Sequence, residues 1–481
     1  MDRVSPLKLS RTSQLMWNLK LTAGVVAGMA LSISSLANAE DWTRFRGPNG
    51  SGIAPAGESV PSEWSDSKNL AWKLALPGPG SSSPIIVGNK VFITCFSGYG
   101  VDGNDPGDLK NLKRHLVCID ATNGTQLWDV GVAASLPEDP YSRMLGEHGY
   151  ASGSPVSDGE HVYVFYGKGG VLAYDLRGKE LWHVNVGTES GPMRWGSGAS
   201  PILHGNLLIV NASEENQSLV ALDKATGKEV WKAQADGLGM TWGTPIIVGE
   251  GEAAELAIGV PGEIWGFNLK TGKLKWYAEG LADNSFCSSL VADGQVVYAI
   301  DGRGGEGVAI RAGGQDDVSK THTVWKAKAP GRISSPIVSD GRIYTSSRGA
   351  VLCLNAATGE QVYQARFPTP DGAAAPAEPP PEGRGGGGFG NGRGGRGGGG
   401  GGGGMGGGQD YASPILVGDK LILITRSGLT HVWQAGPEFK SLAENKFASD
   451  SSKFNGTPAV SGGRLFIRSD KALYCVSAQD R

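Results

Sequence analysis

The sequence predicts an all-β protein in which eight small four-stranded units stack or close into a ring. A small residue precedes a short apolar run eight times, and five of the intervals between these places are 44 to 47 residues long. Units of this length are too small to bury a core alone and must pack on their neighbours. The eight places are Ser83-Pro84, Ser154-Pro155, Ser200-Pro201, Thr244-Pro245, Ser288-Ser289, Ser335-Pro336, Ser413-Pro414 and Thr457-Pro458.

A turn motif in the second half of the units supports the same period. Asp223 is followed by Lys-Ala-Thr-Gly227 and, four residues later, by Trp231. Asp or Asn starts such a turn by bonding its own backbone, and Gly adopts the positive φ that closes it. The motif recurs at Asp120–Gly124 before Trp128, Asp175–Gly178 before Trp182, Asn268–Gly272 before Trp276 and Asn355–Gly359 before Tyr363.

The third unit illustrates the four strands that we expect in each unit. Two strands lie within Pro201–Val210, on either side of a turn at Gly205-Asn206. The other two are predicted at Ser218–Leu222 and Lys228–Ala233, because both segments are short, rich in β-strand formers and bounded by turn residues.

The first 39 residues have the pattern of a secretory signal peptide. Basic residues precede an uncharged run from Leu21 to Leu36, and the Ala-Asn-Ala sequence that ends at Ala39 fits a cleavage site. A single membrane anchor is the alternative, but the run is short and rich in Ser, Thr and Gly. We therefore expect export to the periplasm or secretion, with no transmembrane anchor in the mature chain. Residues 40–68 follow as an N-terminal arm.

The last unit lacks one strand, and a strand near the N-terminus is available to complete it. The segment Thr457–Ser477 supplies only three strands, whereas Asn69–Leu76 is a strand that precedes the first unit. Its Trp72 is placed like the aromatic residue on the outer strand of other units. We expect residues 69–76 to pair with the strand near 472–477, so that 69–481 form one closed ring without open sheet edges.

Two insertions interrupt the period. The polar, turn-rich segment Gly98–Arg114 is predicted to be a surface loop, and its Asp residues lack the spacing of a calcium loop. The segment 371–410 is rich in Pro and then in Gly, with 20 Gly among the 26 residues from Gly383 to Gly408. We expect it to be disordered, because it cannot bury enough surface to offset its ordering entropy. Its Arg residues give it some likeness to RNA-binding RGG tracts, which is the alternative interpretation.

Charge and cysteine content exclude several functions. Residues 1–39 carry four basic residues and one acid, so their removal changes the net charge from −3 to −6 and argues against a nucleic-acid partner. Among the five Cys there is no adjacent pair, CxxC or CxxCH motif. Cys118, Cys353 and Cys475 share a repeat position and are expected to be small buried residues. The seven His have no metal-ligand spacing, so we predict no metal site.

The repeat and the arm resemble a known family. The segment Ala221-Leu-Asp-Lys-Ala-Thr-Gly-Lys-Glu-Val-Trp231 is similar to the tryptophan-docking repeat of pyrroloquinoline-quinone-type (PQQ-like) β-propellers. Asp41-Trp-Thr-Arg-Phe-Arg-Gly-Pro-Asn-Gly50 looks like the opening arm of exported bacterial members. The resemblance extends from Trp42 to Gln479 and implies an eight-bladed β-propeller around a central channel. It is specific for the fold but does not decide the function, because the same fold carries different functions.

The resemblance leaves two functions open. In quinone-dependent dehydrogenases of this type the pattern includes a vicinal disulfide, a stacking Trp, a Ca²⁺ held by acid and amide groups, and an Asp base. Trp195 or Trp242 can stack on a flat ring, but the chain has no Cys-Cys pair, and no residues can be matched to the Ca²⁺ ligands. We therefore expect no cofactor and no catalytic residues, with a PQQ- and calcium-dependent oxidoreductase as the alternative. A second similarity, to the propeller factor that assists outer-membrane protein assembly, favours a monomeric binding or scaffold protein.

The candidate binding residues lie just before the Ser-Pro motifs, where connections enter the innermost strands. In a propeller these connections converge on one mouth of the channel. They carry polar and aromatic residues, which predict a site for a protein, a peptide or a small polar ligand; the alternative is that they only plug the channel. The residues are Glu147, His148, Tyr150, Arg194, Trp195, Trp242, Arg332 and Tyr411.

Overall fold

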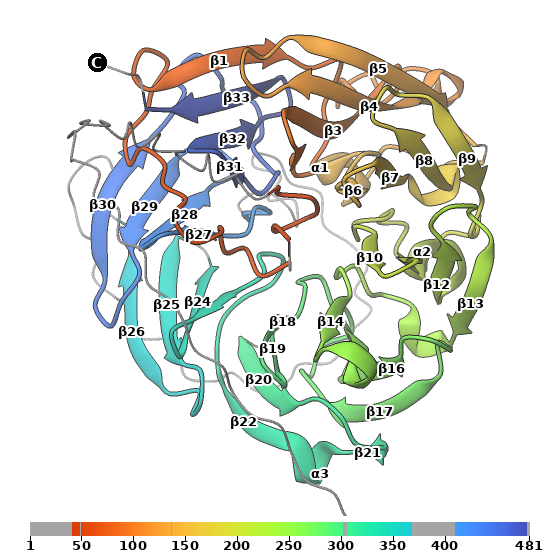
Figure 1. Ribbon diagram of the computed structural model, residues 1–481, viewed down its shortest axis with the longest axis vertical. Coiled ribbons are helices and arrows are strands. Elements are labelled where there is room, and N and C mark those ends of the chain that lie inside the picture. Colours follow the sequence, from red (N-terminus) through yellow and green to blue (C-terminus); the bar gives the residue numbers. More distant parts are fainter. Residues whose placement is uncertain are drawn as a thin grey trace, which may run out of the picture. The chain divides into compact units, whose positions relative to one another are not determined.

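The computed structural model describes residues 41–48, 50–135, 137–301, 305–347, 349–367 and 409–478. All the described residues belong to one compact unit, Ala39–Arg481. Within that unit, eight sheets follow one another around a channel as the blades of a β-propeller (Figure 1). This confirms the fold predicted from the repeat. The predicted signal peptide and residues 371–408 of the predicted insertion lie outside the described residues.

The first four blades run in chain order, each with its innermost strand first. The first blade has β2 (Ile85–Val87), β3 (Lys90–Ser97), β4 (Lys113–Asp120) and β5 (Gln126–Ala133); the second has β6 (Val156–Ser157), β7 (His161–Phe165), β8 (Val171–Asp175) and β9 (Glu180–Val184); the third has β10 (Ile202–His204), β11 (Leu207–Ala212), β12 (Ser218–Asp223) and β13 (Glu229–Gln234); the fourth has β14 (Ile246–Val248), β15 (Glu255–Val260), β16 (Glu263–Asn268) and β17 (Leu274–Glu279). The strands of the third blade confirm the four predicted for this unit.

The last four blades complete the ring. The fifth has β18 (Val291–Asp293), β19 (Val296–Asp301), β20 (Glu306–Arg311) and β22 (Thr323–Lys328); the sixth has β23 (Ile337–Ser339), β24 (Arg342–Ser347), β25 (Ala350–Asn355) and β26 (Gln361–Arg366); the seventh has β27 (Ile415–Val417), β28 (Lys420–Ile424), β29 (Thr430–Gln434) and β30 (Lys440–Asn445); the eighth has β31 (Ala459–Ser461), β32 (Arg464–Arg468), β33 (Ala472–Ser477) and β1 (Leu70–Ala75). The short strand β21 (Asp316–Asp317), from the fifth blade, adds in parallel to the outer edge of β17.

Short helical turns occur only in the connections of the described chain. They are η1 (Leu109–Asn111), α1 (Leu145–His148), η2 (Gly167–Gly169), α2 (Ser213–Asn216), η3 (Asp236–Leu238), η4 (Gly251–Ala253) and α3 (Ser319–His322). Each is only three or four residues long, and accordingly none in the described part of the chain has the length and apolar character needed to span a membrane.

The ring closes where the two ends of the propeller meet. Strand β1 pairs antiparallel with β33, with Trp72 opposite Cys475, as the missing strand in the last unit predicted. The indole Nε1 of Trp72 donates to the carbonyl of Ala121 in the first blade at 3.1 Å. The closing strand therefore joins the eighth blade to the first by both sheet pairing and tryptophan docking.

The same docking contact links most neighbouring blades. An outer-strand Trp donates from Nε1 to the carbonyl of the residue after the Asp or Asn of the next blade's turn, as Trp182 does to Lys224 at 3.0 Å. The turn glycine lies against the indole: at Gly227, φ is +71° and a Cβ would lie 2.7 Å from the Trp182 ring. The turn therefore needs glycine both for its backbone conformation and for the close approach of the ring. The other pairs are Trp128 with Leu176, Trp231 with Leu269 and Trp325 with Ala356.

The arm crosses one end of the channel. The carbonyl of Trp42 accepts from Ile86 in β2, and the carbonyl of Thr43 accepts from Ser157 in β6. Further along, the carbonyl of Gly52 accepts from Leu416 in β27 of the seventh blade. Between these anchors, the side chain of Phe45 faces the channel cavity.

One predicted loop boundary is wrong. The segment Gly98–Arg114 was expected to be a solvated loop, but β4 begins at Lys113, and Arg114 is buried. Arg114 pairs with Glu138 at 2.7 Å, a partner that lies 24 residues further along the chain. The polar character of the segment gave no sign of this tertiary ion pair.

Candidate functional site

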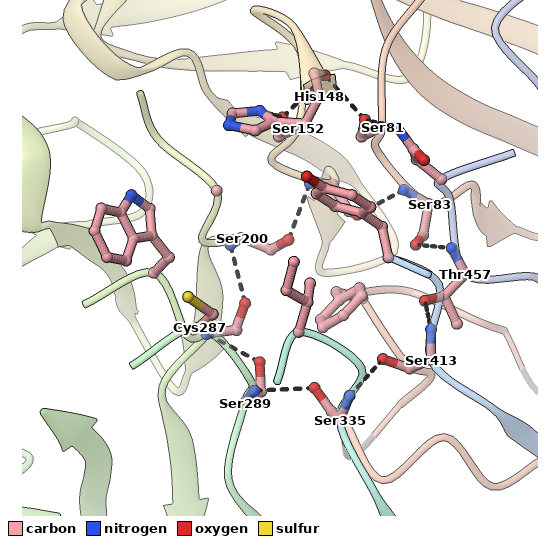
Figure 2. A pocket seen from close by; sticks show the side chains of 18 of the residues that line it. Ser81, Ser83, His148, Ser152, Ser200, Cys287, Ser289, Ser335, Ser413 and Thr457 are labelled. Carbon is pink, nitrogen blue, oxygen red and sulfur yellow. Dashed lines mark hydrogen bonds between the residues drawn. The ribbon is translucent and has the colours of Figure 1, made fainter. Parts of the chain in front are cut away.

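A closed circle of eight hydrogen bonds surrounds the channel. In each blade the backbone N–H of the Ser or Thr that precedes the innermost strand donates to the side-chain hydroxyl of the equivalent residue in the next blade, and Figure 2 shows several of these bonds. The circle runs through Ser83, Ser154, Ser200, Thr244, Ser289, Ser335, Ser413 and Thr457 and returns to Ser83, with N to O distances of 2.8 to 3.0 Å.

The circle explains why the repeat needs Ser or Thr at this position. A buried backbone N–H must find an acceptor, and the hydroxyl of the next blade supplies it. In the fifth unit the participating residue is Ser289, whereas Ser288 donates instead to the carbonyl of Ile300. The sequence motif thus located the position in seven of the eight units and left two candidate residues in the fifth unit.

All eight circle residues line one cavity of about 120 Å³ in the channel. Its remaining wall is apolar or uncharged, and includes Met144, Trp195, Trp242, Ile333 and Tyr411, while Phe45 of the arm contributes from the other end. Within the described residues, no Asp, Glu, Lys or Arg side chain lines this cavity. It therefore offers hydroxyl groups and aromatic surface to a ligand, but no charge.

His148 is the one imidazole on the cavity wall in the described chain, and it is held by two hydrogen bonds. Its Nε2 lies 2.8 Å from the carbonyl oxygen of Trp195, and its Nδ1 lies 2.6 Å from the hydroxyl of Ser152. A carbonyl can only accept, so Nε2 carries the proton and Nδ1 accepts from Ser152. Burial lowers the pKa of His148 to about 4, which keeps the ring neutral near pH 7.

Four of the predicted site residues converge on the cavity: His148, Trp195, Trp242 and Tyr411. The ring centroids of Trp195 and Trp242 are 4.7 Å apart, and the indole N–H of Trp242 donates to the carbonyl of Gly196 at 3.0 Å. Tyr411 lies under the guanidinium of Arg426, which is 4.9 Å from the ring centre. These side chains come from the connections that enter the second, third, fourth and seventh blades, as expected for a channel mouth.

The other four predicted residues do not line this cavity. Glu147 pairs with Arg426 and, at 3.4 Å, with Lys453, and so ties α1 to the connections of the seventh and eighth blades. Tyr150 is buried among aromatic side chains and donates to the carbonyl of Asp139 at 2.7 Å. The Arg194 side chain is 68% exposed, and Arg332 is half-buried. These four residues therefore lie outside the cavity lining, and a shared binding surface of all eight stays a prediction.

The motifs did not reveal a second cavity beside the first. Residues Glu214 and Glu215 of α2 line it together with Arg114, Glu138, Asp139 and Lys168. The pair Glu-Glu follows the apolar strand β11 after Ser213, and two adjacent acidic residues at a strand end are the one sequence signal that could have indicated them.

A quinone with a calcium ion does not fit the channel cavity. Ligand sites commonly enclose about 300–1,000 Å³, whereas this cavity encloses about 120 Å³. The rings of Trp195 and Trp242 face each other closely, so no flat ring can insert between them. No described residue contributes a carboxylate to the cavity wall. The described chain also contains no group of three or more His, Cys, Asp or Glu placed to hold a metal ion. All five cysteines are free thiols, so there is no vicinal disulfide.

The circle of blades, the docking tryptophans and the closing strand define an eight-bladed propeller of the PQQ-like repeat class. A family profile described as outer membrane protein assembly factor BamB matches residues 112–365. This is more than half of the chain, and the protein belongs to this family. A search of curated proteins finds no match.

Solved structures with the same fold come from proteins of different function. BamB from Moraxella catarrhalis is 14% identical, with 86% of this chain and 98% of that chain covered and a TM-score of 0.54. A europium-containing methanol dehydrogenase is 12% identical, with 90% of each chain covered and a TM-score of 0.57. A quinohemoprotein alcohol dehydrogenase from Pseudomonas putida HK5 is 11% identical, with 92% and 81% covered and a TM-score of 0.55. At these identities the likeness concerns the fold.

Proposed function

We propose that this protein is an exported, non-catalytic binding protein that receives an uncharged polar group of a peptide or small ligand in its channel cavity. The observation that carries the proposal is the lining of that cavity. Eight hydroxyl groups surround it, aromatic and aliphatic side chains form its wall, and no charged side chain among the described residues reaches it. Such a lining favours a neutral group that both packs on aromatic rings and forms hydrogen bonds.

The cavity is large enough for the end of a side chain rather than for a whole drug-sized molecule. A volume of about 120 Å³ holds several water molecules. A ligand that inserts one group and keeps the rest outside would displace that water and gain contact with Trp195, Trp242 and Tyr411. This geometry favours a peptide, or a small ligand with one polar end.

The one pair in the cavity that resembles a catalytic dyad argues against catalysis. Ser152 and His148 lie at the distance of a nucleophile and its base. However, a pKa of about 4 makes the imidazole a poor base near pH 7, and its other nitrogen bonds a carbonyl rather than an acid. The Cys287 thiol on the same wall is also unreactive, because burial raises its pKa.

The comparisons support the same proposal. The matched family is described as an outer membrane protein assembly factor, which is a role in binding rather than in chemistry. Such a role supports a location outside the cytoplasm, which the signal peptide predicted from the sequence also favours.

The proposal is tested by filling the cavity. Gly198 lines it with φ outside the left-handed region, and a Cβ there would meet Trp242 atoms at an ordinary 3.7 Å, so Gly198→Leu should fold and occupy the space. Gly103→Leu is the matched control, because a Cβ at this exposed loop position meets nothing within 4 Å. The probes are fluorescent, end-blocked Gly-Ser peptides with one central Tyr, Asn, Gln, Leu, Lys or Glu, and binding is measured by anisotropy.

We expect peptides with a central Tyr, Asn or Gln to bind the unmodified protein and Gly103→Leu equally, and Gly198→Leu at least tenfold more weakly. Equal binding to Gly198→Leu, or binding of the Lys and Glu peptides alone, would overturn the proposal. Titration with PQQ and Ca²⁺ tests the alternative of a quinone-dependent oxidoreductase. Retention of the quinone chromophore after gel filtration would favour that alternative.

A further inference from the structure

The second cavity is acidic and lies beside the channel cavity. Its volume is about 30 Å³, which is enough for about two water molecules. The wall of His148 and Ser152 separates the two cavities, since Ser152 contributes to both. The acidic cavity also reaches the surface, because the exposed Glu189 is part of its lining.

Two ion pairs account for both cations in this lining. Arg114 donates to Glu138 at 2.7 Å, and both side chains are 4% exposed. Lys168 lies 3.0 Å from Asp139, with side chains 9% and 11% exposed. Each cation is thus matched by its own carboxylate, and Glu214 and Glu215 remain as two carboxyl groups without a cation.

The carboxyl groups of Glu214 and Glu215 are buried with oxygens that have no side-chain partner. These residues are 5% and 2% exposed, and neither Oε1 nor Oε2 of Glu214 has a side-chain hydrogen-bond partner, although the backbone N–H groups of Gly191 and Gly196 face this carboxyl group. Glu215 accepts from the Ser197 hydroxyl through Oε1, but its Oε2 has no partner either. Buried carboxyl oxygens are normally well paired, so three oxygens without a side-chain partner in one small cavity leave room for a further donor.

Glycines make room for these carboxyl groups. A Cβ at Gly191 would lie 2.3 Å from Oε1 of Glu214, and its φ is not in the left-handed region, so the close approach is the reason for glycine there. At Gly167 a Cβ would lie 2.9 Å from Oε1 of Glu215. The backbone therefore comes close to the carboxyl groups from two connections. Gly167 lies between β7 and β8 of the second blade, and Gly191 lies in the connection from β9 to β10 that enters the third blade.

We propose that the acidic cavity between η2 and α2 binds a primary ammonium group, either of a free amine or of a lysine side chain. An –NH₃⁺ group has about the size of a water molecule and three N–H donors, which matches the three oxygens without a side-chain partner. Its charge compensates the carboxylates that Arg114 and Lys168 leave unmatched. The guanidinium of arginine is larger and planar, with five donors in a fixed fork, which is more than the three oxygens of this narrow cavity need.

Binding of the amine exchanges a proton for the ammonium charge. Burial, and after it the neighbouring Glu215, raise the pKa of Glu214 to about 8, so Glu214 is protonated near pH 7. Burial also raises the pKa of Glu215, to about 7. The ammonium group requires the ionised carboxylate, so its binding releases a proton to the buffer. Affinity should therefore increase as the pH rises from 6 to 8.5. The titratable and charged groups that face the pair are Arg114, Glu138, Asp139, Tyr150, Tyr166, Lys168 and Glu189.

Calorimetric titration of the purified mature protein tests the proposal. The probes are methylammonium, which represents a free amine, and Nα-acetyl-lysine methylamide, which represents a lysine side chain. The Nα,Nε-diacetyl form of the second probe has no ammonium group and is the ligand control. Glu214→Gln and Glu215→Gln keep the shape of the side chain and remove its charge, and the exposed Glu160→Gln is the control variant.

We expect at least one of the two ammonium probes to bind at pH 8.5, at least tenfold more weakly at pH 6, and with a heat at pH 7 that depends on the ionisation enthalpy of the buffer. Each Gln variant at the cavity should weaken binding at least tenfold, and Glu160→Gln should not. Binding of methylammonium alone indicates a free amine as ligand, and preference for the lysine probe indicates a polypeptide.

Three results would overturn the proposal: no binding of either ammonium probe, equal binding of the diacetyl probe, or binding of Ca²⁺ without any binding of amine. If a Gln variant fails to fold, the comparison of the ammonium and diacetyl probes on the unmodified protein still decides. The proposal is also independent of the channel cavity, because Gly198→Leu should leave ammonium binding unchanged.

Discussion

Removal of one hydroxyl from the circle around the channel should leave one buried amide without a partner. Ser335 is 2% exposed, and its Oγ accepts from the N–H of Ser289 at 2.9 Å. In Ser335→Ala this N–H loses its acceptor, which costs about 1–3 kcal/mol for a buried polar group. The lower end applies if a water molecule from the adjoining cavity takes the place of the hydroxyl. Ser335→Thr is the control, since Thr244 and Thr457 already serve in other blades.

Two measurements check this prediction. Unfolding entropy of about 2.1 cal/mol/K per residue makes 1–3 kcal/mol equivalent to a fall of about 1–4 °C in Tm for a chain of this size. Amide hydrogen exchange is more specific: protection of the Ser289 amide should decrease in Ser335→Ala and be kept in Ser335→Thr, while the Ser83 amide on another part of the circle stays protected. Unchanged protection of the Ser289 amide in Ser335→Ala would show that the hydrogen bond does not exist, and the account of the repeat residue would be refuted.

Three further predictions concern closure, the insertion and pH. Trp72→Ala should lower the free energy of unfolding by about 3–5 kcal/mol, as a tryptophan truncation does, and proteolysis should start at the junction of β1 and β33. The control is Trp128→Ala, which removes a docking contact away from the closure. Equal protease sensitivity of the β1–β33 junction in this control would contradict the prediction. Deletion of 383–408 should leave Tm nearly unchanged, because loop entropy changes by only about 0.6 kcal/mol per doubling of length; a large fall would show that the tract stabilises the fold. The pKa values of Glu214 and Glu215 rise on folding to about 8 and about 7, whereas those of His148 and His431 fall to about 4 and oppose their effect up to about pH 6.5, so stability should fall as the pH rises from about 6.5 to 8. A Tm that is flat over this range, or equally steep in Glu214→Gln/Glu215→Gln, would contradict the shifts.

The sequence was most informative where one residue type must recur in every blade. The Asp-to-Gly turn and its Trp predicted the outer strands, because the docked indole requires both the turn carbonyl and the glycine, as Trp182, Lys224 and Gly227 show. The closing strand could be predicted because Trp72 repeats this position. The Ser-Pro motif gave the period, but its role in the hydrogen-bonded circle became clear only from the structure.

The site was harder to predict because its residues do not recur. Position before an innermost strand correctly brought Trp195, Trp242 and Tyr411 to one cavity. The same rule failed for Tyr150, whose ring turns away to pack on Phe96 and Tyr99, and for Glu147, whose partner Arg426 lies 279 residues away. Glu214 and Glu215 lie in the connection between β11 and β12 within the third blade, and a positional rule based on connections between blades does not include it.

The polar contacts between blades also explain why the ring closes rather than growing as an open array. Both contacts have a direction: a blade donates through the N–H of its Ser or Thr and through its outer Trp, and the next blade accepts through a hydroxyl and a turn carbonyl. In an open array the donors of the last blade would face water, and the last blade would form neither of these contacts. Here the last donors, Thr457 and Trp72, find their acceptors on Ser83 and Ala121 of the first blade. Closure thus satisfies the final polar groups as well as the final sheet edge, and it fixes eight hydroxyl groups around one cavity before any ligand arrives.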